Sequence, residues 1–322
     1  MRVGVVGATG LIGGELLKAL DRAPWRPAEV VPLASSRSSV STVRYGDADI
    51  AVDNLGEEVL GDLDIAFFAT QPEVAKTVGR AAAAEGVAIV DCSGGLAGDG
   101  PLVVPWLNPA ALRDDPRILV LPSPAALAVA SVLAPLRRAG LTAQAEATVL
   151  LPASTEGRAG LEELSRQVVA LMGGGTPPRK VFPRGLAFDL VPQVGTASAE
   201  GWTPRERSVS AQVAELCGGP PPDITLVQVP VFSGVCAEVR LRGRFDPAEM
   251  AKMLEAGGLR VHSENTDRNV PRSRNVEGRP FADVGRIRVG ADATWMWVAL
   301  DNLSATAAAA VGCGGLLARA LT

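Results

Sequence analysis

A glycine-rich segment near the start of the chain has the residue types and spacing of a phosphate-binding turn. It runs Gly7-Ala8-Thr9-Gly10-Leu11-Ile12-Gly13, between an apolar run at residues 3–6 and a stretch of helical periodicity that ends before Pro24. A strand that ends in glycines and opens a helix directs backbone N–H groups and the positive end of the helix dipole toward one point. Gly7 would permit the tight bend, Gly10 the close approach of a phosphate, and Gly13 close packing of helix on strand. The segment therefore predicts a dinucleotide-binding βαβ unit; the alternative is a turn that holds no ligand.

The end of the second apolar run, Val30 to Ala34, bears on the choice of cofactor. An acidic residue at this place would bind the ribose of NAD, whereas the sequence continues Ser35-Ser36-Arg37-Ser38. A guanidinium flanked by hydroxyls suits a 2′-phosphate. We therefore expect NADP in preference to NAD, with a solvated polar loop as the alternative interpretation.

The pattern of apolar residues divides the chain into two parts. Up to residue 121, short apolar runs alternate with helical stretches such as Glu73 to Glu85, which predicts a parallel sheet with helices on both faces. From about Ala143 the runs are longer and alternate, which predicts a mixed or antiparallel sheet. We expect one face of that sheet to be covered by helices at residues 160–171, 205–216 and 247–256. Residues 265–279 are expected to form an exposed polar loop, and Ser304 to Leu321 a closing helix.

Composition excludes several classes of partner. The 322 residues are 47% hydrophobic and 20% charged, with a net charge of −4, so neither nucleic acid nor an anionic membrane surface is expected as a partner. The four cysteines are far apart and form no CxxC pair, which argues against a metal site or a disulfide framework. The chain opens directly with an apolar strand and shows no leader-like segment, so we expect a cytoplasmic protein.

Several stretches together resemble the aspartate-semialdehyde dehydrogenase family, and the resemblance extends over nearly the whole chain. They are GATGLIGGELL at Gly7, LASSRS at Leu33, IVDCSGG at Ile89, PLVVPWLNP at Pro101, AFDLVP at Ala187, VQVPVFSG at Val227, VGRIRV at Val284 and ALDNLSATAAA at Ala299. The resemblance implies an α/β fold with a Rossmann-type dinucleotide-binding domain at residues 1–122. It also implies an α+β dimerisation domain with a mixed or antiparallel sheet at residues 123–302. The last helix, residues 303–322, would pack back on the first domain, and the chain would form a homodimer. Expected cofactor contacts are Gly7, Thr9, Gly10, Gly13, Ser35, Arg37, Ser38 and Ser93, with Leu11 and Ile12 completing the turn.

Enzymes of that family reduce an acyl phosphate through a thioester, which requires a cysteine nucleophile and a histidine acid/base. Their Asn-Pro-Asn-Cys motif matches Leu121-Pro122-Ser123-Pro124, so Pro124 stands where the thiol should be. Their histidine position is occupied by Val235. The charged and amide groups that would bind substrate are also replaced, at Ala97, Ser154, Ser208, Gln212 and Gln228. The resemblance is therefore to the USG-1 type of paralogue, which lacks the cysteine in the same way, and we assign no catalytic residue.

The remaining reactive side chains do not replace the lost ones. Cys92 and Cys236 are expected to be buried and inert, because neither has a neighbouring cation and Asp91 would raise the pKa of Cys92. The sole histidine, His262, is expected to lie in a loop, either exposed or hydrogen-bonded within the protein. Three hypotheses remain: a catalytically silent, NADP-binding protein, an NADP-dependent oxidoreductase of altered chemistry on an aldehyde or oxo group, and a structural or regulatory subunit whose cofactor turn is vestigial.

Overall fold

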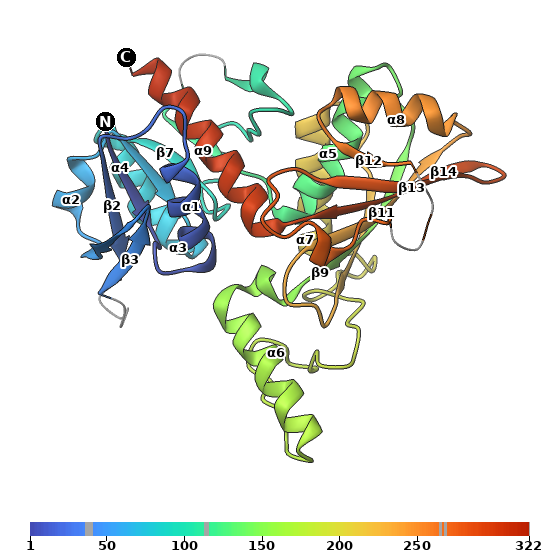
Figure 1. Ribbon diagram of the computed structural model, residues 1–322, viewed down its shortest axis with the longest axis horizontal. Helices are drawn as coiled ribbons and strands as arrows, with labels where there is room; N and C mark the ends of the chain where they lie inside the picture. The colour runs from blue at the N-terminus through green and yellow to red at the C-terminus, as the bar shows by residue number, and fades with distance from the viewer. Residues whose placement is uncertain (36–40, 113–115, 264–265, 267–268, 322) are drawn as a thin grey trace. The chain divides into compact units, whose positions relative to one another are not determined.

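Two compact units make up the chain. The computed structural model describes residues 1–35, 41–112, 116–263, 266 and 269–321. Unit 1 comprises Met1–Pro122 together with Thr306–Thr322, and unit 2 comprises Ser123–Ala305 (Figure 1). The chain therefore leaves unit 1 after residue 122 and returns to it at residue 306.

Unit 1 is built on a parallel sheet in the order β5-β2-β1-β6-β7-β8. All of its neighbouring strands run parallel. The strands are β1 (Arg2–Val6), β2 (Glu29–Ala34), β5 (Asp53–Asn54), β6 (Ile65–Phe68), β7 (Ala88–Asp91) and β8 (Ile118–Val120). The chain places β2 on one side of β1 and β6 on the other, so the strand order reverses next to β1. In doubly wound sheets, ligands bind at the carboxyl ends of the strands at such a reversal.

The helices of unit 1 largely follow the expected pattern. α1 (Leu11–Asp21) succeeds β1, and α2 (Glu57–Gly61) precedes β6. The expected helix at residues 73–85 is present as three consecutive pieces: α3 (Pro72–Val74), a π-helical turn (Ala75–Gly79) and α4 (Arg80–Ala84). A Cβ at Gly79 would lie 3.3 Å from Leu96 and 3.4 Å from Phe68, so the π turn occurs where the helix passes close to its neighbours. A hairpin of β3 (Thr42–Tyr45) and β4 (Ala48–Ala51) and a 3₁₀ turn (Pro109–Ala111) complete the described part.

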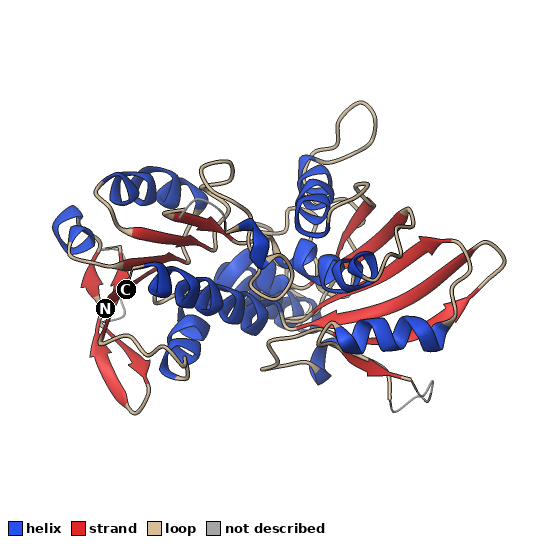
Figure 2. Cartoon of the chain, turned by 90° about the horizontal axis from the view of Figure 1, so that it is seen from above, coloured by secondary structure: helices blue, strands red, loops and turns tan. Residues whose placement is uncertain are grey.

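Unit 2 contains a mixed sheet, as the alternating pattern predicts. Its order is β10-β9-β11-β14-β13-β12. The outer pairs β10/β9 and β12/β13 are parallel and the inner pairs antiparallel. Figure 2 shows these strands side by side. Their bounds are β9 (Ala145–Leu151), β10 (Asp223–Gln228), β11 (Val235–Arg242), β12 (Arg260–His262), β13 (Asp283–Val289) and β14 (Ala293–Leu300).

Alternation along the strands buries one face of this sheet under helices. In β9, Ala145, Ala147, Val149 and Leu151 are buried and the residues between them are not. The covering layer consists of α5 (Pro124–Arg138), α7 (Pro204–Cys217) and α8 (Pro247–Ala256). The expectation that α6 (Gly157–Met172) also covers the sheet is wrong. α6 follows a 3₁₀ turn (Ala153–Glu156) and packs on a separate small core around Leu164, Phe182 and Leu186.

The last helix, α9 (Asn302–Ala320), begins in unit 2 and has most of its length in unit 1. Glycines bring it close to its neighbours there, because a Cβ at Gly314 would lie 2.6 Å from the Phe67 ring. The indole Nε1 of Trp25 donates a hydrogen bond to the carbonyl of Val311 at 3.1 Å. By length and composition alone α9 could cross a membrane, but 56% of its apolar window is buried inside the structure. These contacts are those of a core helix.

Candidate functional site

The turn between β1 and α1 has a geometry that requires glycine at two of its three glycine positions. Gly7 has a φ of +87°, and a Cβ added to it would lie 2.3 Å from the carbonyl oxygen of Ala69. A Cβ on Gly13 would lie 2.2 Å from the carbonyl oxygen of Gly7. Gly7 donates its N–H to Leu33 O at 2.8 Å, which fixes the turn against β2. The roles expected of Gly7 and Gly13 therefore follow from contacts within the protein.

Gly10 differs, because packing within the protein does not by itself require glycine at this position. A Cβ there would lie 3.2 Å from Gly7 O and 3.8 Å from Ala69 O, so a methyl group would crowd the turn less than one at Gly7 or Gly13. The first helical hydrogen bond runs from Gly14 N to Gly10 O at 3.1 Å. The N–H groups of Leu11, Ile12 and Gly13 precede it and have no acceptor within the helix. With no acidic residue in this first turn, the half-buried Thr9 and its neighbours fit a pyrophosphate.

The residues expected to select the cofactor are only partly visible. Ser35 is exposed at the end of β2. Arg37 and Ser38 lie outside the described residues. The preference for NADP over NAD therefore stays a prediction from sequence.

Ser93 belongs to a turn that is organised by a buried acid. Asp91, the last residue of β7, is fully buried and accepts hydrogen bonds from Ser93 N at 2.8 Å, Ser93 Oγ at 2.6 Å and Leu96 N at 2.8 Å. Ser93 Oγ in turn accepts from Gly95 N at 3.0 Å. Asp91 is thus a positioning residue for the turn at the carboxyl end of β7. Its place immediately after an apolar strand is the only sequence sign of that role.

At the family's nucleophile position, the polar groups are hydrogen-bonded to one another within the protein. Pro124 is the first residue of α5, and Ser123 is its N-cap, accepting from Ala126 N at 3.3 Å. Ser123 donates its backbone N–H and its hydroxyl to Oε1 of Gln212 on α7, at 2.8 and 2.9 Å. Gln212 Nε2 donates to Ser208 Oγ at 3.1 Å. The Ser123 hydroxyl therefore points its proton at a neutral amide oxygen, which is not a general base.

The family's histidine position is buried, and the polar groups around it are also hydrogen-bonded within the protein. Val235 is completely buried at the start of β11. The preceding Gly234 donates its N–H to Oδ1 of Asn302 at 3.0 Å, and Asn302 Nδ2 donates to Ser154 Oγ at 3.1 Å. Gln228, at the end of β10, donates Nε2 to the carbonyls of Leu151 at 3.0 Å and Pro152 at 2.9 Å.

These positions share one edge of the unit 2 sheet and one chemical character. The carboxyl ends of β9, β10 and β14 meet the start of β11 at this edge, because β11 runs antiparallel to β9 and β14. The side chains there are neutral amides and hydroxyls that satisfy one another. In unit 1, Ala97 is exposed and carries no polar group. Such groups hold a fold together but offer no fixed charge for an acyl phosphate or a carboxylate.

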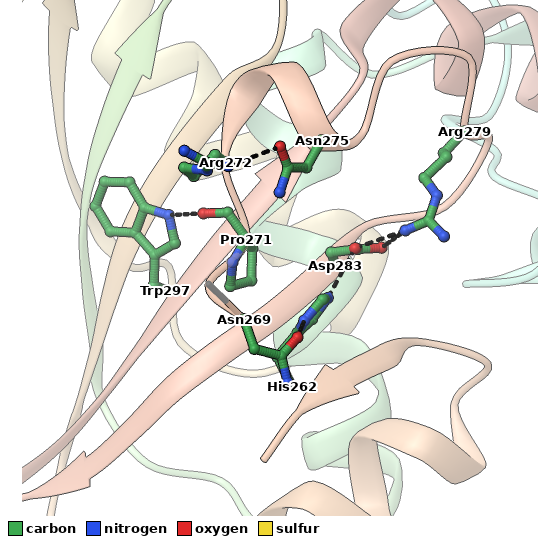
Figure 3. Close-up of polar contacts among 8 residues, drawn as sticks. All are labelled: His262, Asn269, Pro271, Arg272, Asn275, Arg279, Asp283 and Trp297. Carbon is green, nitrogen blue, oxygen red and sulfur yellow. Dashed lines mark hydrogen bonds and ion pairs between the residues drawn. The ribbon is translucent and has the colours of Figure 1, made fainter. Parts of the chain in front are cut away.

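His262 does not lie in a loop, contrary to the expectation from sequence, and of the two expected states, exposed or hydrogen-bonded, the structure shows the second. It ends the three-residue edge strand β12, and its side chain is 11% exposed. Nε2 lies 2.8 Å from Oδ2 of Asp283, and Nδ1 lies 2.7 Å from Oδ1 of Asn269 (Figure 3). Arg279 Nη1 donates to both carboxylate oxygens of Asp283, at 2.9 and 2.7 Å. Both ring nitrogens are engaged within the protein.

The segment 269–279 is a loop with one 3₁₀ turn (Ser273–Asn275) and several exposed residues, as expected, but it is also anchored to the sheet by hydrogen bonds. Trp297 Nε1 donates to Pro271 O at 3.0 Å (Figure 3), Gly278 N donates to Asp301 Oδ2 at 2.7 Å, and Val276 is completely buried. A Cβ on Gly234 would lie 2.8 Å from Ser273. The segment therefore lies directly over the start of β11.

The cysteines lack the features of reactive thiols. Burial, and then the charge of Asp91, raises the pKa of Cys92 well above its usual value. Burial raises the pKa of Cys236 to about 11 and that of Cys217 to about 12. Among the residues that the structure describes, no three His, Cys, Asp or Glu side chains are grouped to hold a metal ion. Chemistry by a thiolate therefore finds no support at these positions.

Comparison with known proteins gives matches along almost the entire chain. Residues 2–115 match the model of the semialdehyde dehydrogenase NAD-binding domain, and residues 133–305 match that of the semialdehyde dehydrogenase dimerisation domain. A USG-1 protein homolog of Pseudomonas aeruginosa is 32% identical over 319 residues, which cover 96% of this chain and 94% of the relative. Aspartate semialdehyde dehydrogenase II from Vibrio cholerae superimposes with a TM-score of 0.91 at 27% identity, covering 99% of this chain and 98% of that one. The aspartate semialdehyde dehydrogenase with NADP from Candida albicans shares the fold, with a TM-score of 0.73 at 19% identity over 100% of this chain and 99% of that one.

Proposed function

The chain belongs to the semialdehyde dehydrogenase family, and we propose that it is an NADP-binding member that does not carry out phosphorylating dehydrogenase chemistry. Unit 1 would bind the cofactor through the turn at Gly7–Gly13. Unit 2 would pair two copies of the chain, since residues 133–305 match a dimerisation domain.

The observation that carries the proposal is the pair of residues at the family's reactive positions. An acyl phosphate is reduced through a thioester only if a thiolate attacks it, and Pro124 has neither a nucleophilic atom nor a backbone N–H. The side chain of Val235 has no group that could donate or accept a proton, and it is completely buried. The nearest hydroxyl, that of Ser123, is hydrogen-bonded to the Gln212 amide. These features support a catalytically silent site and argue against an active site in which other residues replace the cysteine and the histidine.

Support for cofactor binding comes from the fit of the turn. Three N–H groups of α1 lie beyond the reach of helical acceptors, and a Cβ on Gly10 would meet only Gly7 O and Ala69 O within 4 Å. A nicotinamide cofactor bound there would supply a hydride donor or acceptor. The preference for NADP follows from Arg37 between two serines, and a protein of the same fold has been observed with NADP.

Binding can be tested by titrating the pure protein with NADPH and NADH and following nicotinamide fluorescence. We expect NADPH to bind more tightly. Gly10→Ala should weaken binding about tenfold or more, because its methyl group occupies the phosphate side of the turn. Gly14→Ala is the matched control, since a Cβ there meets nothing within 4 Å. Absence of binding by both dinucleotides would remove the cofactor from the proposal.

Activity needs a separate measurement. We expect no reduction of NADP when the protein is mixed with aspartate semialdehyde and phosphate. Turnover that is abolished by Cys92→Ala would show that a thiol outside the family position acts as the nucleophile. The proposal of a catalytically silent site would then be wrong. Oxidation of NADPH by aspartate semialdehyde in the absence of phosphate, if it survives this substitution, would instead favour direct hydride transfer from the cofactor to an oxo group.

A further inference from the structure

The segment 269–279, here called the strap, lies over the start of β11 and buries little of its own surface. All of its residues are described, and of these Pro271 and Val276 alone are buried. Two hydrogen bonds connect its middle to the sheet, from Trp297 Nε1 to Pro271 O and from Gly278 N to Asp301 Oδ2. A segment with few buried apolar contacts opens more readily than the strands beneath it. The contacts at the two ends of the strap therefore decide how firmly it is held.

One buried carboxylate secures both of these ends. Asp283 of β13 is 3% exposed, and its two oxygens accept hydrogen bonds from Nη1 of Arg279, the last residue of the strap, at 2.9 and 2.7 Å. Its Oδ2 also lies 2.8 Å from His262 Nε2. At the first residue of the strap, Asn269 Oδ1 lies 2.7 Å from His262 Nδ1 (Figure 3). His262, Asp283 and Arg279 thus tie the beginning and the end of the strap to one point, and they are called the latch.

The latch is the strongest polar contact that the strap makes. Hydrogen bonds between a guanidinium and a carboxylate are about twice as strong as those between neutral groups. Arg279 belongs to the strap and Asp283 to the sheet, so the strap cannot leave β11 unless this pair separates. Asp283 is therefore the residue whose removal should release the strap.

A thiol lies beneath the strap. Val276 packs into a small core with Cys236, Ala299, Leu150 and Trp297. Cys236 is 7% exposed, and burial raises the pKa of its thiol to about 11, against a smaller lowering by the backbone N–H of Ser273 in the strap. The reactivity of Cys236 consequently reports whether the strap is in place.

We propose that the strap is a conformational device: it opens as a unit when the latch is broken, while the strands of unit 2 stay folded. Opening uncovers Cys236 and the edge beside Gly234, where a Cβ would meet Ser273 at 2.8 Å. The family's histidine position, Val235, lies between these two residues, so the latch controls access to this edge. The device operates whether or not unit 1 binds NADP.

The four cysteines of the chain provide the test. Parent and variants are treated with N-ethylmaleimide, and mass spectrometry follows which cysteines are modified over time. Asp283→Asn leaves one acceptor oxygen for two donors, so Cys236 should be modified at least about tenfold faster than in the parent. Cys217 is the internal control, because its sulfur contacts Ala130 O on α5 at 3.7 Å and has no part in the strap. Its rate of modification should be unchanged.

Two further variants separate the latch from general loosening of the fold. Asn269→Ala keeps the buried Asp283 and removes the link at the first strap residue, so Cys236 should be modified about threefold faster or more. Arg272→Gln is the matched control on the strap itself, since the exposed Arg272 contacts Asn275 within the strap at 3.3 Å. This variant should react like the parent.

An equal acceleration at Cys236 and Cys217 would mean that unit 2 loosens as a whole, and the assignment of an independent strap would be wrong. Unchanged modification of Cys236 in both Asp283→Asn and Asn269→Ala would show that the latch does not hold the strap. Hydrogen exchange supplies a second readout on the same proteins. Peptides that cover residues 270–279 should exchange faster in these two variants, whereas peptides from β9 should keep the parent rate.

Discussion

Glu163 offers a sharp test of how α6 is held to the segment 178–190 that returns along it, because one buried carboxylate accepts three backbone N–H groups of that segment. The residue is 2% exposed, and its two oxygens accept three backbone N–H groups and Gln167 Nε2. In Glu163→Gln the amide nitrogen must face either Phe182 N or the pair Lys180 N and Val181 N. At least one backbone donor is then left without an acceptor, and the others lose a charged one.

The magnitude follows from these contacts. A buried donor without a partner costs about 1–3 kcal/mol, and exchanging a charged for a neutral acceptor costs about 1 kcal/mol more. We expect opening of the segment to become easier by about 3 kcal/mol, which is a factor of about 100 in an opening equilibrium. Glu162→Gln is the matched control, since Glu162 is exposed and pairs with Arg166 at 3.7 Å. Its effect should stay below about 0.5 kcal/mol.

Hydrogen exchange read by mass spectrometry on peptides that cover residues 178–187 is the appropriate assay, because it reports local opening within one unit. In Glu163→Gln these amides should exchange about 100 times faster than in the parent and in Glu162→Gln. Unchanged exchange at Lys180, Val181 and Phe182 would refute the reasoning.

Acidity should act in the same direction as the substitution. Burial would raise the pKa of Glu163, but the backbone N–H groups of Phe182, Val181 and Lys180 outweigh it, and the pKa is lowered. A carboxylate whose pKa is lowered by folding stabilises the folded state at pH values above its unfolded pKa of about 4.3. That contribution is lost as the pH falls through the lower, folded pKa. Protection of residues 180–182 should therefore decline in the parent below about pH 4, and in Glu163→Gln this decline should be absent.

The remaining predictions concern the core of each unit and the segment over the sheet. Burial raises the pKa of Cys217 to about 12 and that of Cys236 to about 11, so both thiols are protonated at pH 8. A disulfide reagent should therefore modify these two residues in the unfolded protein and not in the native protein. Trp297→Phe removes the hydrogen bond to Pro271 O and should lower the free energy of unfolding of unit 2 by about 1–2 kcal/mol, measured by urea denaturation. An unchanged denaturation midpoint would mean that water replaces this hydrogen bond. Asn302→Leu should cost about 2–3 kcal/mol, because it leaves Gly234 N without its acceptor; Ser304→Ala, which loses one hydroxyl contact to Asp301, is a milder comparison in the same melts.

The sequence was most informative where the physical cause is local. Gly7 and Gly13 could be assigned because a strand, a tight bend and a helix follow one another within a dozen residues, and the close contacts that exclude a Cβ arise inside that stretch. The burial of Cys236 likewise follows from its place in an apolar strand. For such features, period and residue type are sufficient.

The hydrogen bonds that satisfy the polar groups at the family's reactive positions could not be predicted in this way. Gln212 meets Ser123 across 89 residues, and Asn302 meets Ser154 across 148. A neutral polar residue carries no sign of which distant group it will satisfy. α6 was misplaced for a related reason: its buried face includes Glu163 and Gln167, whose partners are backbone amides, so amphipathic spacing could not show that it packs on its own small core.

The division of unit 1 into two segments has a consequence for the order of events during synthesis. Trp25, Phe67 and the strands around them leave the ribosome long before Gly314 and the rest of α9, which fill their side of the core. All of unit 2 is translated in between and is uninterrupted in sequence. We therefore expect unit 2 to fold without waiting for α9, while unit 1 keeps an apolar surface uncovered until α9 has left the ribosome. A chain truncated before residue 306 would never cover that surface, so premature termination ahead of α9 should be followed by aggregation or proteolysis.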